Sequence, residues 1–393
     1  MGLAKNWAPL SFGQEALWFL WKLVPDSWAY NIARPAGVRG PLDVAALRAA
    51  LQALSDRHAA LRLEFREEGG KVFQHALDQH DVVLEEIDAS DWDDARVDAA
   101  VREHARKPFD LEQSAAMRTT LFRRSADHHI LLIVVSHIVS DLWSLIVVMD
   151  ELREVYAAMK EGRTHSLPRL PMTFDDAVRQ QRGAIEGEAG ERLWQHWRDE
   201  LSGELPVLDL PAGRSRPAMQ SFRGGTIVRR MPAELTRKLK QVAGRERVTL
   251  YMLLLAAYEV LLHRYTGQES FVVGSPTSGR ERPELQGIAG DFVNMVPLRA
   301  DLSGAPPFRE LLARVRARVL GTIQHSDFPF SLLVDRLHAV RDLSRSPIFQ
   351  TTFVLQKFHR YPELSRVMLP DENEPPIPFA DLLLEPIALA QQD

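Results

Sequence analysis

The 393-residue sequence contains no cysteine. This absence excludes disulfides, zinc–thiolate sites and a cysteine nucleophile together. It also suits a reducing compartment, so we expect a cytoplasmic protein. The sequence has no run of the ~18 apolar residues that a membrane helix needs, and its first ten residues lack an apolar core of signal-peptide length. We therefore expect no membrane association.

Neither sign of charge is in large excess. The chain has 48 Lys and Arg against 53 Asp and Glu, which gives a net charge of −5. Such a balance favours neither nucleic acid nor an anionic membrane surface as a partner. Apolar residues make up 45% and charged residues 26%, as in folded soluble proteins. The length exceeds that of one ordinary core and favours two domains.

Apolar spacing and helix-capping residues predict alternating helices and strands in both halves of the chain. Predicted helices follow the caps Ser11, Asp43 and Thr249, another begins after Asp141, and others cover 191–201, 308–320 and 330–337. Predicted strands are 72–73, 82–87, 130–135, 270–274 and 349–355. The Gly- and Pro-containing segment 160–172 predicts a linker. This order indicates two α/β lobes joined near 160–175.

One short stretch carries candidate chemistry. Residues 136–142 read S-H-I-V-S-D-L, with His137 at the end of a buried strand and Asp141 four residues later. A histidine in this position is most often a packed core residue, and the alternative is a base. A metal site is disfavoured because no third ligand is near in sequence. His128 and His129 also form no metal pair, because neighbouring strand residues point to opposite faces.

Seven stretches, in order, resemble the core motifs of condensation domains of non-ribosomal peptide synthetases. That family belongs to the chloramphenicol-acetyltransferase-like superfamily. The stretches are Ser11–Leu20, Arg57–Phe65, Ser136–Leu142, Thr173–Val178 (a weaker match), Ile288–Arg299, His325–Phe330 and Arg341–Pro347. A single short motif would be weak, but seven in the right order and spacing are specific.

The third stretch departs from the family signature His-His-x-x-x-Asp-Gly at two positions. Ser136 replaces the first histidine and Leu142 replaces the glycine, whereas His137 and Asp141 are retained. The resemblance assigns the chemistry to the second histidine, so Ser136 bears on efficiency more than on reaction type. Leu142 adds a side chain where the family has none, and we expect it to narrow the channel or change the turn.

The resemblance implies an α/β fold of two acetyltransferase-like lobes, which form a V-shaped pseudo-dimer with the active site in a tunnel between them. We place the N-terminal lobe, with the active-site motif, at 1–165 and the C-terminal lobe at 166–393. Family members usually continue beyond the end of this chain. We therefore expect the C-terminal lobe to be incomplete, with 388–393 leading into another strand.

The implied reaction is acyl transfer that forms an amide. An acyl or peptidyl thioester on one carrier protein is attacked by the amine of an aminoacyl group on a second. His137 takes the amine's proton, orients the amine or stabilises the tetrahedral intermediate, and the sequence does not separate these roles. The resemblance also implies a structural ion pair between Asp141 and an arginine of the other lobe, for which Arg280 is the candidate. Asn294 is a candidate for a channel-facing amide.

The implied partners are the donor and acceptor carrier proteins and neighbouring synthetase domains. We expect a monomer without a cofactor of its own, because both substrates arrive on the carriers' phosphopantetheine arms.

Three alternatives stay open. In the first, the fold is the same but the acceptor is an alcohol or a free amine. In the second, the domain is a degenerate, non-catalytic docking platform for carriers or tailoring enzymes. The third, with weaker support, is an epimerisation domain. Ser136, Leu142 and the short C-terminus motivate the platform.

Overall fold

The computed structural model describes residues 7–113, 115–211, 213, 216–339, 342–356, 363–364 and 375–389. The chain divides into two compact units. Unit 1 draws its described residues from Met1–Arg182, Arg280–Phe292 and Phe358–Ala390, and unit 2 draws them from Gly183–Gly279 and Val293–Lys357. Each unit therefore contains segments that are distant in sequence.

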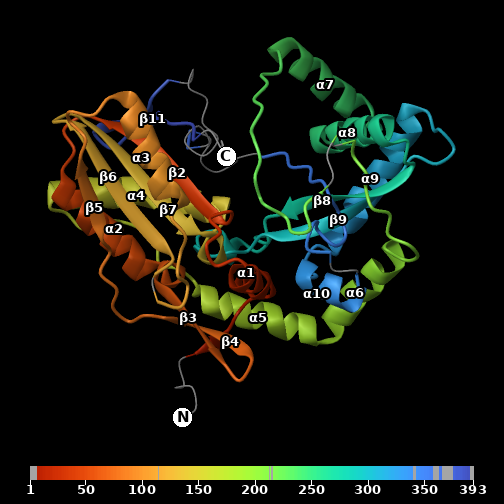
Figure 1. The fold of residues 1–393 in the computed structure, drawn as a ribbon, viewed down its shortest axis with the longest axis horizontal. Coiled ribbons are helices and arrows are strands. Elements are labelled where there is room, and N and C mark those ends of the chain that lie inside the picture. The colour runs from red at the N-terminus through yellow and green to blue at the C-terminus, as the bar shows by residue number, and fades with distance from the viewer. Residues whose placement is uncertain are drawn as a thin grey trace. The chain divides into compact units, whose positions relative to one another are not determined.

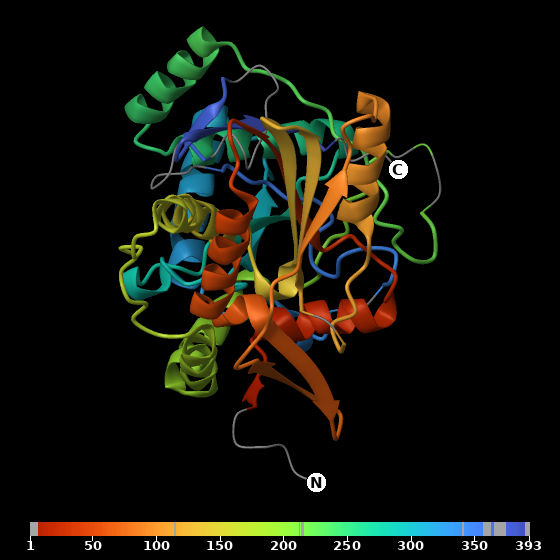
Figure 2. The same ribbon diagram turned by 90° about the vertical axis from the view of Figure 1, so that its left-hand side faces the viewer.

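Unit 1 is built on a six-stranded sheet in the order β10-β11-β2-β7-β6-β5, in which β5 and β6 run parallel and the other neighbours antiparallel. Figures 1 and 2 show β2, β7 and β6 side by side. A second sheet has the order β1-β4-β3. The strands are β1 Ala8–Pro9, β2 Asn31–Arg39, β3 Leu63–Glu68, β4 Lys71–Ala76, β5 Leu84–Asp88, β6 Met117–Ser125, β7 His128–Ser136, β10 Ile377–Phe379 and β11 Leu382–Pro386.

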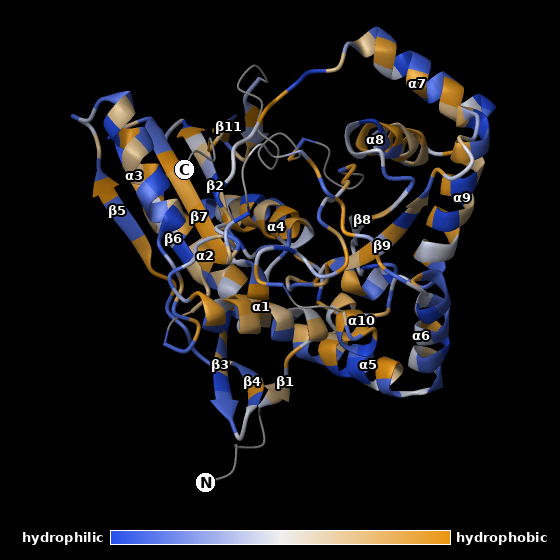
Figure 3. Cartoon of the chain, turned by 45° about the vertical axis from the view of Figure 1, so that its right-hand side comes forward, coloured by the Kyte–Doolittle hydropathy of each residue, from blue (hydrophilic) through white to orange (hydrophobic). Residues whose placement is uncertain are grey.

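The helices of unit 1 cover both faces of the six-stranded sheet. They are α1 Phe12–Leu23, α2 Val44–Arg57, η1 Ala59–Arg62, α3 Asp94–Arg106, η2 His137–Val139, α4 Leu142–Glu161 and η3 Pro283–Leu285, and α5 Phe174–Glu186 begins in this unit. Alternate residues of Ile130–Val135 in β7 enter a core cluster shared with α2 and α4 and another shared with α1 and α3. This two-sided burial explains the unbroken apolar run, and Figure 3 shows β7 as hydrophobic.

Unit 2 packs helices on an antiparallel pair of strands, β8 Ser270–Thr277 and β9 Asn294–Asp301. Its helices are α6 Glu188–Glu200, α7 Ala233–Arg245, α8 Leu250–Thr266, α9 Phe308–Gln324 and α10 Phe330–Arg336. The core cluster lies between α8, α9 and the two strands. Glu259 of α8 and Arg318 of α9 form a buried ion pair within the unit.

The predicted helix starts are confirmed, because short-range hydrogen bonds determine them. The side chains of Ser11, Asp43, Asp141 and Thr249 each accept a hydrogen bond from the backbone N–H three residues later. Gly267 ends α8 with φ +72°, a left-handed conformation that suits glycine. The linker at 160–172 has no strand and no helix beyond the end of α4.

The predicted strand 349–355 is wrong. No strand forms there, although Gly274 N donates to Thr351 O and Phe353 N donates to Gly274 O, at 2.9 Å each. A single bridge links Gly274 and Thr352. The segment therefore contacts β8 at this point but does not extend the ladder. The sequence analysis also missed β2 and β6, the strands on either side of β7.

The lobes 1–165 and 166–393 stay a prediction, because the compact units are a different division of the chain. Residues 280–292 belong to unit 1 through the contacts described below. Of the segment 388–393, only 388–389 are described, as irregular backbone. Among the helices that the structure describes, none is both long and apolar enough to cross a membrane.

Gly274→Ala should destabilise unit 2. A Cβ at Gly274 would lie 2.5 Å from Cε2 of Phe349, a ring that is itself buried. We expect a loss of about 1–3 kcal/mol in the free energy of unfolding, measured by urea denaturation. Gly244→Ala is the control, because no atom lies within 4 Å of a Cβ there, near the end of α7, and alanine favours helix by ~0.5–1 kcal/mol. Equal stability of the two variants would contradict the prediction.

Candidate functional site

The candidate site lies where β7 ends and α4 begins. The chain leaves β7 at Ser136, makes a single 3-10 turn at His137–Val139 and enters α4 after Asp141. His137 N donates to Tyr30 O at 2.8 Å, which holds the turn against the segment that precedes β2. Gln14 of α1 is fully buried and donates to Ile138 O at 3.0 Å. The sequence analysis missed this support, although Gln14 belongs to the first motif.

Asp141 is fully buried and its carboxylate binds several donors at once. Ser144 N and Ser144 Oγ donate to Oδ1 at 2.7 and 2.8 Å. Phe292 N donates to Oδ2 at 3.2 Å, and Arg280 Nη1 donates to the same oxygen. The ion pair between Asp141 and Arg280 has both side chains 0% exposed. The structure therefore brings these two candidates together, and both belong to unit 1.

Arg280 also binds the segment 288–292 of the fifth motif. Its Nη2 donates to the carbonyl oxygens of Ile288 and Gly290, each at 3.2 Å, and to Ser144 Oγ at 2.7 Å. Gly290 N donates to Ser144 Oγ at 3.0 Å, and the guanidinium lies 4.2 Å from the ring centroid of Phe292. We call Asp141, Ser144, Arg280 and 288–292 the buried knot. It ties the start of α4 to 288–292.

Aromatic packing closes the buried knot. The rings of Phe174 and Phe292 meet edge to face with centroids 5.2 Å apart. A Cβ at Gly290 would lie 2.1 Å from Cδ2 of Phe174, so only glycine allows this contact. The fourth motif, a weaker match in the sequence, thus contributes Phe174 to the surroundings of Asp141. Thr173 N donates to the carboxylate of Asp176 at 2.9 Å at the start of α5, a capping interaction.

The imidazole of His137 faces a second carboxylate that the sequence analysis missed. Nδ1 of His137 lies 3.5 Å from Oδ1 of Asp291, with the side chains 33% and 4% exposed. Burial by itself lowers the pKa of His137, but the carboxylates of Asp291 and then Asp141 outweigh it and raise the pKa to about 8. Burial raises the pKa of Asp291. The signal in the sequence is the acidic residue inside the apolar motif I-A-G-D-F-V.

The two variant positions of the third stretch have structural roles. Ser136 is 7% exposed, and its backbone N donates to Ala116 O at 2.8 Å at the end of β7. Leu142 begins α4 and packs against the core cluster of α2 and α4. Its φ is not positive, so the backbone there does not require glycine.

Asn294 does not fit the expected channel-facing amide. Its Nδ2 donates to Ser326 O at 2.8 Å and Phe328 O at 2.7 Å, and its Oδ1 accepts from Phe330 N at 2.9 Å. Both N–H donors are therefore engaged within unit 2. The side chain holds the turn before α10, which corrects the expectation. Arg341 of the seventh motif lies outside the described residues.

Arg57 and Arg62 of the second motif bind other parts of unit 1. Arg57 donates to both oxygens of Glu151 in α4, at 3.0 and 3.1 Å, and His58 Nε2 lies 2.7 Å from the same carboxylate. Arg62 Nε donates to Ser55 O at 3.1 Å. These contacts join α2, η1 and α4.

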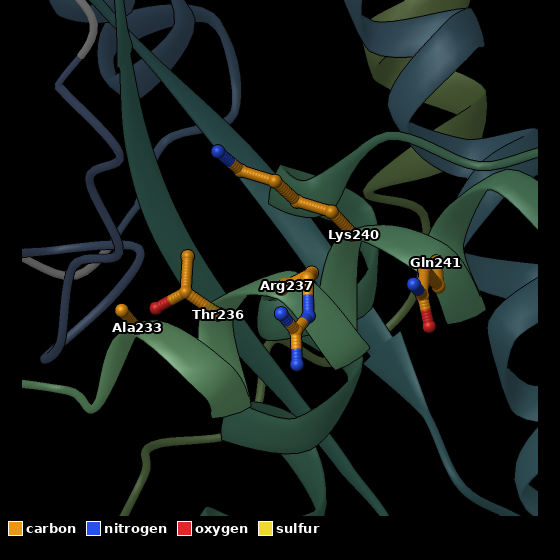
Figure 4. A pocket seen from close by; sticks show the side chains of 5 residues that line it. All are labelled: Ala233, Thr236, Arg237, Lys240 and Gln241. Atoms are coloured by element: carbon orange, nitrogen blue, oxygen red, sulfur yellow. The ribbon is translucent and has the colours of Figure 1, made fainter.

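A hollow in unit 2 lacks the groups of the candidate site. It has a volume of about 660 Å³, lies along α7 and is lined by Ala233, Thr236, Arg237, Lys240 and Gln241 (Figure 4). Its lining holds cations but no acid or histidine. No three His, Asp or Glu side chains gather as metal ligands in the part of the chain that the structure describes.

Comparison with known proteins agrees with the motif order. A protein-family profile described as "Condensation domain" matches residues 4–374. One of the linear gramicidin synthase proteins from Brevibacillus parabrevis is 41% identical over 354 residues, which cover 89% of this chain and 5% of that protein. The chain thus spans about a twentieth of the length of this relative.

Solved structures share the fold. The X-domain in a complex with OxyB from teicoplanin biosynthesis is 30% identical, with a TM-score of 0.82 over 90% of this chain and 78% of that chain. The first condensation domain of the CDA synthetase has a TM-score of 0.76 at 20% identity, over 99% of this chain and 88% of that chain.

Asp141→Asn should destabilise unit 1 strongly. The change leaves the guanidinium of Arg280 buried without its counter-charge, and breaking such a pair costs about 3–5 kcal/mol. The matched control is Asp98→Asn, because Asp98 and Arg102 form an exposed pair on α3 of a kind that contributes ~0.3–0.5 kcal/mol. Urea denaturation of the two variants gives the comparison. A loss below about 1 kcal/mol for Asp141→Asn would show that the pair does not hold the unit together.

Proposed function

The chain belongs to the condensation-domain family, and from this premise we propose that it joins a donor acyl or peptidyl thioester to an acceptor amine, with His137 as the reacting group. The observation that carries the proposal is the difference in solvent exposure between two residues of one motif. A third of the His137 side chain is exposed, whereas Asp141 is fully buried. A reacting group must reach substrate, and a structural charge need not.

Family membership confirms the resemblance found in the sequence. The structural neighbours confirm the chloramphenicol-acetyltransferase-like α/β fold. Condensation domains are the amide-forming acyltransferases of non-ribosomal peptide synthetases, so the predicted enzyme class is confirmed at the level of the family. The roles of individual residues are the proposal developed here.

The proposed step moves one proton. The acceptor nitrogen attacks the thioester carbonyl carbon, and a tetrahedral intermediate forms with its negative charge on oxygen. Nε2 of neutral His137 takes a proton from the nitrogen. The carbon–sulfur bond then breaks, the amide carbonyl forms again, and the departing sulfur receives the proton. Neither a covalent enzyme intermediate nor a serine or cysteine nucleophile is needed.

The charge state of His137 suits this step. Its pKa of about 8 exceeds the ordinary value near 6.5, so the neutral imidazole is a stronger base than a free one. After the transfer, the imidazolium lies beside the carboxylate of Asp291. The rate should therefore rise as the pH increases through about 8, because only the neutral ring accepts a proton.

Carrier proteins are the proposed partners. The relatives are parts of large synthetases, of which this chain matches one segment. Domains of this family act on substrates held on the phosphopantetheine of carrier domains, so we propose a donor carrier, an acceptor carrier and neighbouring synthetase domains for this chain. The chain's own lack of a cofactor and its monomeric state stay predictions.

His137→Ala should abolish amide formation. We expect single-turnover product, measured by mass spectrometry with loaded donor and acceptor carriers, to fall at least about 100-fold, since a general base contributes ~10²–10⁴. His128→Ala is the control, because His128 begins the same strand. Product at the wild-type rate from His137→Ala would refute the catalytic role. Product from wild type with alcohol but not amine acceptors would redirect the proposal to ester formation, and rejection of every alcohol would remove that alternative.

A second candidate is a docking platform without turnover. The observation that favours it is the 30% identity to an X-domain found in a complex with OxyB, together with Ser136 in place of the first histidine. The same assay decides between the two. Carrier binding with no product above background, and with equal behaviour of wild type and His137→Ala, would support the platform.

Ser136→His should raise the rate if the serine weakens the site. The position is 7% exposed, so the larger ring must displace neighbours, and we expect a stability loss of about 1–3 kcal/mol. Single-turnover rates of wild type and variant, compared at equal folded fraction by circular dichroism, measure the effect. Product from the variant and none from wild type would identify a silenced enzyme.

A further inference from the structure

We propose that Asp291 is the positioning residue of this site: its carboxylate accepts the Nδ1 proton of His137 and leaves Nε2 to face the acceptor. The inference rests on the proposed function only for the role of Nε2 as the base that takes the acceptor's proton. The pairing of the two side chains is a separate claim, and the experiments below test it separately.

The first argument is geometric. His137 Nδ1 and Asp291 Oδ1 lie 3.5 Å apart, and neither atom has a hydrogen-bond partner among the described residues. Both atoms are buried away from solvent. A buried donor and a buried acceptor without other partners would each cost free energy unless they satisfy one another. A distance of 3.5 Å is long for a strong hydrogen bond, and such contacts often shorten when substrate binds.

The second argument is that Asp291 cannot easily move away. Its neighbours on both sides belong to the buried knot: Gly290 binds Ser144 and Arg280, and Phe292 N donates to Asp141. The backbone of Asp291 is therefore held between two anchored residues. A residue fixed in this way can hold a ring in one orientation, as an active site requires.

The third argument concerns the space beside the carboxylate. A Cβ at Gly13 in α1 would lie only 3.1 Å from Oδ2 of Asp291. The position before Gln14 thus carries no side chain where the carboxylate approaches α1. Helix α1 leaves room for Asp291, while Gln14 holds the backbone beside His137.

The charges around the ring decide its protonation. Asp291 and Asp141 both favour the imidazolium, while Arg280 acts on Asp291 and opposes protonation of that carboxylate. Burial raises the pKa of the Tyr30 phenol, so this neighbour is neutral near pH 7. Because Arg280 already neutralises Asp141, the charge without a fixed counter-ion is that of Asp291. His137 is its counter-ion when protonated.

The decisive measurement is the titration of the His137 ring by NMR with labelled histidine. In wild type we expect a midpoint near pH 8, and in Asp291→Asn a fall to about 6.5 or below, because burial then acts without the paired carboxylate. Asp175→Asn is the matched control. Asp175 is another largely buried carboxylate of unit 1 whose pKa is raised by burial, and its removal should leave the His137 midpoint unchanged.

Kinetics supply the second readout. The pH–rate midpoint of Asp291→Asn should move down with the ring's midpoint, and its maximal kcat should fall by at least about 10-fold with little change in KM, as D→N changes beside catalytic histidines misplace the tautomer. A merely structural role would lower activity at every pH without moving the midpoint.

The outcomes are distinct. A wild-type midpoint near the ordinary value of about 6.5, or an Asp291→Asn midpoint equal to that of wild type, overturns the pairing, and the wild-type titration needs no variant to fold. A midpoint near 8 that falls in Asp291→Asn supports it. If that result accompanies full activity of His137→Ala, the pairing stands and the proposed function fails.

Discussion

The buried ion pair between Asp141 and Arg280 is the interaction on which the candidate site depends. Asp141 caps α4, and its other oxygen and Arg280 bind 288–292, so one carboxylate joins two segments that are distant in sequence. Such a pair adds little stability relative to a well-packed apolar core, because both ions must be desolvated. Its effect here is geometric. Because a buried charge must be paired, the segment 288–292 has few other ways to pack against α4.

The same knot is the reason that we propose His137, and not Asp141, as the reacting group. Four donors occupy the carboxylate of Asp141, so it has no free lone pair of suitable direction for substrate. His137 lies one turn earlier, with its backbone held by Tyr30 and its ring partly exposed. The two residues of the motif therefore differ in role. Asp141 stabilises the loop, whereas the side chain of His137, four residues earlier, is partly exposed to solvent.

The sequence allowed correct prediction of features that depend on short-range physics. Helix caps such as Ser11 and Thr249 were predictable because a cap is a contact between residues three apart. The Asp141–Arg280 pair came only from the family resemblance, since nothing local connects those positions. Asp291 was missed because its meaning depends on a ring far along the chain. Asn294 was misjudged for a similar reason: an amide in a motif suggests substrate, but a neighbouring turn uses both of its donors.

The charges of four neighbouring groups favour protonation of His137. The cluster contains two carboxylates, Asp141 and Asp291, one guanidinium, Arg280, and one imidazole, His137. With a neutral imidazole the four groups sum to one negative charge, and with an imidazolium they sum to zero. Net charge is costly in a poorly solvated interior, so the cluster favours uptake of a proton by His137. In the proposed reaction, this charge balance favours transfer of the proton from the attacking nitrogen to His137, and the imidazolium that results pairs with Asp291.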